Sequence, residues 1–70
     1  MTTVEKRSLS IAGHRTSIAL EPEFWAALDD AAAADGRSMA GLITEIDEGR
    51  DPEQGLASAV RVWLLKRTSR

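Results

Sequence analysis

The chain has no cysteine and a single histidine, His14, among its 70 residues. Without cysteine it can form neither a disulfide nor a thiolate metal site. One histidine does not make a zinc or nickel site either, because such sites use several ligands of this kind. We therefore expect no metal ion and no other cofactor, and we interpret His14 as a turn residue or a contact to a phosphate.

Long apolar runs are also missing. No apolar run follows the first charged residues, as it would in a secretory signal, and no segment approaches the ~20 apolar residues of a membrane span. The sequence therefore predicts no membrane association and, by default, a cytoplasmic location.

The chain lacks the excess of positive charge that is typical of nucleic-acid-binding proteins, since its net charge at pH 7 is −2. The charge is unevenly distributed, however. Residues 1–20 have a local net charge of +2, residues 21–53 of −8 and residues 54–70 of +4. The N-terminal third can therefore form a DNA-facing surface, although the general electrostatic attraction to DNA will be modest.

The chain is short, and a domain of this size buries only about 60% of the surface that its unfolded chain exposes. The hydrophobic fraction of 43% includes many alanines, which bury little area. Both properties favour one domain that shares its core with a second copy in an obligate oligomer.

The clearest local pattern is the strand predicted over residues 15–20, followed by Pro22, whose fixed φ ends a strand and suits the start of a helix. Side chains alternate along this strand with a period of two, which is the signature of a half-buried strand. A lone strand leaves its backbone polar groups unpaired, and the simplest partner is the same strand of a second copy. One face carries Thr16, Ile18 and Leu20, and the other carries Arg15, Ser17 and Ala19.

Residues 1–14 have a weaker pattern, and we interpret them as a flexible basic arm. Residues 7–11 alternate slightly and would make a short extra strand if residues 12–14 formed a turn. We favour the arm, because residues 7–11 contain only two strongly apolar positions.

Three helices are expected after the strand. The first runs from about Pro22 to Asp35 and ends at Gly36, a typical C′ residue. Ser38 is expected to cap a second helix over about residues 39–48.

The third helix is expected within residues 49–70, with Asp51 as N-cap and Pro52 at the first helical position. Its apolar stripe includes Trp63 and follows helical spacing. Val62 and Leu65 lie beside this stripe and widen the apolar face, which favours contact with a partner protein.

The order strand, helix, Gly36-Arg37-Ser38 turn, helix over residues 15–46 resembles the ribbon-helix-helix family of DNA-binding proteins. Residues 6–25, KRSLSIAGHRTSIALEPEFW, look like a bacterial branch of small members with an extra C-terminal helix. The resemblance implies a mainly α protein with one β-strand, forming an intertwined homodimer with a two-stranded antiparallel intersubunit ribbon. The family core would span residues 15–48, and residues 49–70 would supply the third helix.

The resemblance also implies which side chains contact DNA. The outward strand residues would read bases in the major groove, where arginine pairs with guanine and an alanine methyl can contact a thymine methyl. The N-terminus of the second helix would bind a phosphate, as free N–H groups and the helix dipole favour. The expected base readers are Arg15, Ser17 and Ala19, and the expected phosphate or arm contacts are Lys6, Arg7, His14, Arg37, Ser38 and Met39.

The expected function is sequence-specific binding of double-stranded DNA at palindromic or repeated sites, as a transcriptional repressor. The alternative is a dimeric interaction module, such as an antitoxin, whose C-terminal helix binds a partner protein. An enzyme is the least expected class, because no base, nucleophile and oxyanion donor are seen to converge in so small a chain.

Overall fold

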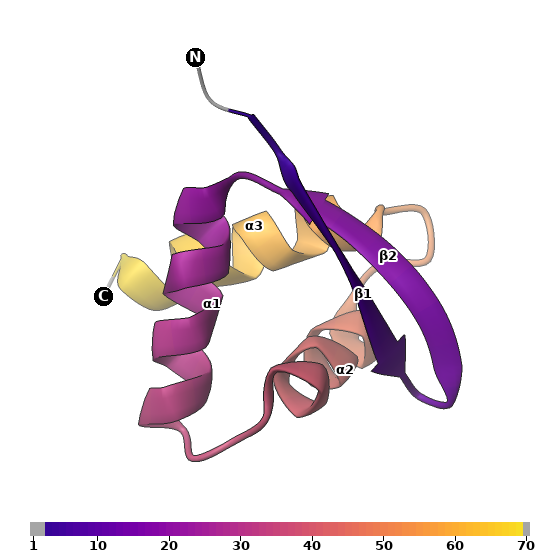
Figure 1. Ribbon diagram of the computed structural model, residues 1–70, viewed down its shortest axis with the longest axis horizontal. Helices are drawn as coiled ribbons and strands as arrows, with labels where there is room; N and C mark the ends of the chain where they lie inside the picture. Colours follow the sequence, from indigo (N-terminus) through magenta and orange to yellow (C-terminus); the bar gives the residue numbers. More distant parts are fainter. Residues whose placement is uncertain (1–2, 70) are drawn as a thin grey trace.

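The computed structural model describes residues 3–69, which form a β-hairpin packed on three helices (Figure 1). Within this range no helix is long and apolar enough to cross a membrane. The elements in chain order are β1 (Glu5–Ile11), β2 (His14–Leu20), α1 (Pro22–Ala34), α2 (Met39–Gly49) and α3 (Leu56–Thr68).

The two strands pair antiparallel within one chain, with a register that runs from Glu5 opposite Leu20 to Ile11 opposite His14. The interpretation of residues 1–14 as a flexible arm is therefore wrong over β1, and β2 does not lack a mate in its own chain. The reason lies in the turn, where Ala12 and Gly13 both have positive φ, 52° and 82°. Positive φ at both central residues is what a tight type I′ hairpin turn requires.

The alternation expected along β2 is confirmed. Ile18 and Leu20 are buried beneath the hairpin and Thr16 is half-buried, whereas the other side chains of the strand are exposed. The hairpin thus has one face on the helices and one face in solvent, as Figure 1 shows.

The first two helices begin and end close to where the sequence indicates. Pro22 is the first residue of α1, and Gly36 follows its end with a φ of 64°. The Arg37 N–H donates to the Ala32 carbonyl at 2.9 Å, which completes a Schellman-type C-cap. Ser38 is the N-cap of α2, because its hydroxyl accepts the Gly41 N–H at 3.0 Å.

The third helix begins later than expected, at Leu56, with Gly55 rather than Asp51 as its N-cap. Asp51 instead starts a turn, in which its carboxylate accepts the Glu53 N–H at 2.9 Å. Arg50 fastens this turn by donating to the Gln54 carbonyl at 2.7 Å. An aspartate followed by proline is compatible with a turn as well as with a helix start. In this chain the hydrogen bond from Arg50 to the Gln54 carbonyl stabilises the turn.

The core closes within a single chain. Its largest fully buried side chains come from β2 and from all three helices, so the hairpin and helices are held by one shared apolar cluster. Trp63 lies only half-buried at the edge of this cluster. The fully buried large residues are Leu20, Trp25, Leu28, Leu42, Ile43 and Val60.

Candidate nucleic-acid interface

The solvent face of the hairpin is built from both strands. The register places Lys6 opposite Ala19, Ser8 opposite Ser17, and Ser10 opposite Arg15. All six side chains are exposed, and cross-strand partners lie on the same face of a sheet. We call the surface formed by Lys6, Ser8, Ser10, Arg15, Ser17 and Ala19 the ribbon face.

The ribbon face combines two cations with small polar side chains. Ser8 Oγ and Ser17 Oγ lie 3.2 Å apart at its centre, and each hydroxyl can donate and accept hydrogen bonds. The one acidic residue of the hairpin, Glu5, is paired opposite Leu20, at a position of the other face. An anionic ligand therefore meets cations and hydroxyls on this face, and small side chains let it approach the backbone closely.

Sequence reasoning missed Ser8 and Ser10. The available signal was the alternation of Lys6, Ser8 and Ser10 with more apolar neighbours, but only the pairing register shows that these serines share a face with Arg15. β1 thus contributes half of the ribbon face, and of its three residues there only Lys6 was predicted from the sequence to contact DNA.

Arg7 lies on the opposite face of the hairpin from Arg15. Its guanidinium carbon is 4.6 Å from the centroid of the Trp25 ring, and its Nε lies 2.6 Å from a Glu5 carboxylate oxygen. The Trp25 indole N–H donates to the Glu5 carbonyl at 2.8 Å. Arg7 and Trp25 therefore fasten the open end of the hairpin to α1. The Arg7 side chain thus lies away from Lys6 and Arg15, which stand on the ribbon face.

His14 lies at the closed end of the hairpin, opposite Ile11, and is exposed. It borders a small cavity beside the end of α2, where Asp47 and Arg50 also lie. Within residues 3–69, no group of three or more His, Asp or Glu side chains is placed to hold a metal ion.

The N-terminus of α2 is the second region expected to contact DNA. The first N–H groups of a helix have no acceptor within it, and the helix dipole favours an anion there. Ser38 is engaged in capping, and Met39 is half-buried against the core. Arg37 folds over the first turns of α2, where it donates to the Glu45 carboxylate at 2.7 Å and to the Gly41 carbonyl at 3.0 Å.

Residues 4–68 match the family model described as a ribbon-helix-helix domain. The chain belongs to the ribbon-helix-helix family. This family is typical of DNA-binding regulators and antitoxins, and its members are generally not enzymes. No curated protein and no solved structure matches the chain. The family assignment made from residues 15–46 is confirmed, and the match also takes in β1 and α3.

In this ribbon-helix-helix domain, α3 is tied to both ends of α1 by arginine–carboxylate pairs. Arg61 lies 2.8 Å from a Glu21 carboxylate oxygen, and Arg67 lies 2.9 Å from an Asp35 carboxylate oxygen. The hydrogen bond from Arg61 lowers the pKa of Glu21, and the hydrogen bond from Arg67 lowers the pKa of Asp35. Two of the C-terminal cations are thus engaged with α1 and its flanks.

Proposed function

We propose that this ribbon-helix-helix protein is a sequence-specific DNA-binding regulator of transcription, acting as a repressor, and that its ribbon face enters the major groove. The observation that carries the proposal is the composition of that face, which has two cations, three serines and no carboxylate. Such a surface suits a polyanion with hydrogen-bonding base edges far better than it suits an apolar partner.

The dimensions support the same proposal. The major groove is about 12 Å wide and admits a two-stranded β-ribbon. Arg15 is the proposed reader of guanine, Ser10 lies directly opposite it, and Ala19 can contact a thymine methyl. Ser8 and Ser17 can donate to or accept from either base of a pair.

The N-terminus of α2 is the proposed phosphate clamp. Its free N–H groups would hold one phosphate, and Arg37 would exchange its contact with Glu45 for that phosphate. Phosphate contacts of this kind fix the position of a protein on DNA without selecting sequence. The proposed clamp residues are Arg37, Ser38 and Met39, with Lys6 and His14 as further backbone contacts.

We propose a homodimer on palindromic or repeated sites, in which each subunit inserts its own hairpin. An intersubunit ribbon would place the partner's strand at the free edge of β2. The resulting four strands would span about 14 Å between their outer axes, which is more than the groove width of about 12 Å. An intersubunit ribbon in the groove would therefore require β1 to leave β2.

The second candidate function is an antitoxin-like interaction module. It is favoured by one observation, the exposure of Val62 and Leu65 on α3. A stable complex with one partner protein at fixed stoichiometry would support it.

The DNA proposal is tested with duplexes selected from a random pool on the wild-type protein. Arg15→Ala should lower affinity for the selected site much more than affinity for random DNA, because a bidentate guanine contact discriminates by about 1–3 kcal/mol. Arg37→Ala is the matched control and should weaken both duplexes to a similar extent while reducing the salt dependence. If Arg15→Ala changes neither affinity, the ribbon face does not enter the groove.

A further inference from the structure

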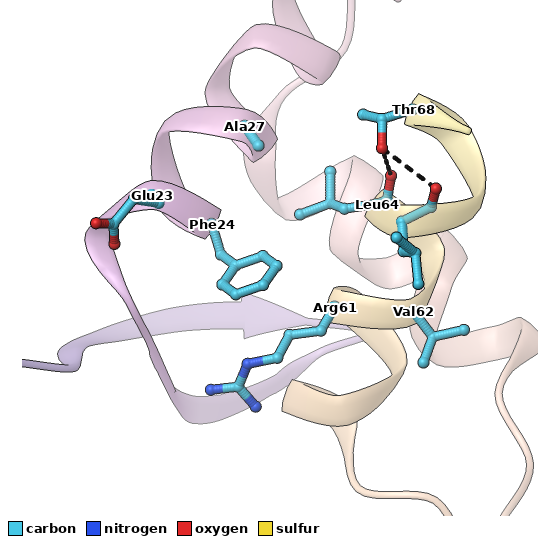
Figure 2. A pocket seen from close by; sticks show the side chains of 8 residues that line it. Glu23, Phe24, Ala27, Arg61, Val62, Leu64 and Thr68 are labelled. Carbon is cyan, nitrogen blue, oxygen red and sulfur yellow. Dashed lines mark hydrogen bonds between the residues drawn. The ribbon is translucent and has the colours of Figure 1, made fainter. Parts of the chain in front are cut away.

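A groove runs between α1 and α3, and its lining is mainly apolar (Figure 2). One part of it begins beside Phe24 and has a volume of about 360 Å³. A second part, of about 310 Å³, continues along α1 to Ala34. Ala27, Leu64 and Thr68 line both parts, so the two form one continuous groove, which we call the α1–α3 groove.

The length of the groove suits a polypeptide better than a small molecule. Phe24 and Ala34 are ten positions apart in α1, which corresponds to about 15 Å of helix. About three turns of a partner helix would cover this length, whereas a small molecule would fill one part of the groove only. Between the two ends, α1 contributes Ala27 and Ala31 to the lining, and their short side chains let a partner backbone approach closely.

The α3 side of the groove holds the most exposed apolar residue of the helices. Leu65 is 65% exposed and Val62 is 37% exposed, and within residues 3–69 the one other exposed large hydrophobic residue is Val4. Isolated exposed apolar residues need no explanation, but two that border an apolar groove form a patch suited to an interface.

The two arginines that line the groove are already neutralised. Arg61 lies 2.8 Å from a Glu21 carboxylate oxygen. Arg67 lies 2.9 Å from an Asp35 carboxylate oxygen. These cations therefore offer little attraction to an anionic partner.

The two acidic residues that line the groove are not neutralised. Glu23 lies at the rim of one part and Asp30 at the rim of the other, and neither has an ion-pair partner within residues 3–69. Figure 2 shows the Glu23 carboxylate turned away from the floor of the groove. Seven positions separate the two residues, which is about two helical turns, so both stand on the same side of α1 at about 10 Å along its axis. A partner in the groove thus meets an apolar floor beside two unbalanced negative charges.

We propose that the α1–α3 groove binds an amphipathic helix of another protein, with an apolar face and basic residues about two turns apart along one edge. Helices dock in this way by laying apolar side chains of successive turns into a groove. The apolar face would cover Phe24, Val62 and Leu65, and the basic residues would pair with Glu23 and Asp30. None of the residues that line the groove belongs to β1 or β2, so the ribbon face stays accessible. The inference goes beyond DNA binding and does not depend on it.

A synthetic helical peptide of about four turns serves as the probe, and its binding to the full chain is measured by fluorescence anisotropy without DNA. It carries leucines at helical spacing and two lysines seven positions apart, and a second peptide carries glutamates in place of these lysines. The wild-type protein should bind the lysine peptide about tenfold or more tightly than the glutamate peptide, because two ion pairs become two repulsions. Equal affinities, or no binding of either peptide, would overturn the inference.

Charge reversal on α1 tests which carboxylates select the peptide. The Glu23→Lys/Asp30→Lys double variant should prefer the glutamate peptide over the lysine peptide. Asp29→Lys is the control and should keep the wild-type preference, since Asp29 is an exposed acidic residue of α1 that lines neither part of the groove. A double variant with the wild-type preference would contradict the proposed pairing.

Filling the groove tests where the peptide lies. Ala27→Phe places a ring where the two parts of the groove meet and should weaken binding of the lysine peptide about tenfold or more. Ala26→Phe is the matched control, because it adds the same ring one position earlier, on the exposed side of α1, and it should bind like wild type. Thermal unfolding of both variants checks that the fold persists. Unchanged binding by Ala27→Phe would place the peptide elsewhere and overturn the inference.

Two further measurements separate this inference from other readings of the groove. If Ala27→Phe, but not Ala26→Phe, changes self-association in sedimentation equilibrium without peptide, a second copy occupies the groove and the inference is wrong. Arg15→Ala leaves the groove intact and should bind the lysine peptide like wild type. Failure of the DNA proposal and failure of this inference are therefore distinguishable.

Discussion

On the ribbon face the side chains are small, polar or cationic and stand in solvent, whereas the groove between α1 and α3 is lined mainly by apolar side chains (Figure 2). The ribbon face takes part in no packing of the subunit, since its residues are exposed on both strands. The groove is an extension of the core, because Leu64 is buried in its floor. The two surfaces therefore differ in chemistry, because one presents cations and hydroxyls and the other presents mainly apolar side chains.

The ribbon face keeps its shape only while Trp25 supports the hairpin. Trp25→Ala should destabilise the protein by about 3–5 kcal/mol, because it opens a cavity in the core and removes the hydrogen bond to the Glu5 carbonyl. Trp63→Ala should cost clearly less, since Trp63 is only half-buried. Urea unfolding of the two variants measures the difference in their free energies of unfolding. If both variants lose the same free energy of unfolding, the hairpin is not fastened through Trp25.

A disulfide across the ribbon face would fix this surface and leave the groove between α1 and α3 unchanged. Ser8→Cys/Ser17→Cys should oxidise within one chain, because the two hydroxyl oxygens lie 3.2 Å apart and the chain has no cysteine of its own. Closing this short loop should add about 2–3 kcal/mol of stability. Gel mobility without reductant measures the linkage.

The single variant Ser17→Cys is the control for that linkage. With a hairpin closed inside each chain, it should form little disulfide between chains. Rapid crosslinking of Ser17→Cys into covalent dimers would instead favour a ribbon made of β2 from both subunits, and it would contradict the closed hairpin.

The two ion pairs that tie α3 to α1 should make a small contribution to stability that acid removes. The pKa values of Glu21 and Asp35 are lowered from ordinary values near 4.5 and 3.8, so both carboxylates stabilise the folded state above those values. This contribution should be lost as the pH falls below them, because protonation removes the contacts with arginine. The side chains of both pairs are about one-third exposed to solvent, which screens their interaction, so the loss should be small.

Unfolding midpoints measured from roughly pH 6 to pH 3 test this dependence. The Arg61→Gln/Arg67→Gln double variant should lose part of the pH dependence that wild type shows. If the variant and wild type respond to acid equally, the two pairs do not contribute to stability.

Elements set by local chemistry were predictable from the sequence. The alternation in β2, Pro22 at the start of α1, Gly36 after its end and the Ser38 cap each depend on a residue type at one position. The outward placement of Arg15 followed from the same alternation.

Elements that depend on distant contacts were not predictable in this way. The turn before β2 contains Ala12 at positive φ, where asparagine or glycine would have been a clear signal. The hairpin is also held by Trp25, 20 positions away from Glu5. Likewise, Asp51 and Pro52 suit a helix start by residue type, but they lie in a turn that Arg50 closes by donating to the Gln54 carbonyl. Ser8 and Ser10 joined the candidate site only through the strand register.

The fastening of the hairpin at its open end by Trp25 has a thermodynamic consequence for DNA recognition. A flexible arm would lose conformational entropy on binding, at about 1–2 kcal/mol for each backbone residue that becomes ordered. In this chain β1 is already paired with β2 and tied to α1. The loss of conformational entropy therefore occurs when the protein folds and not when it binds. The proposed association with DNA would then be the docking of two preformed surfaces, without the large heat-capacity change of coupled folding and binding.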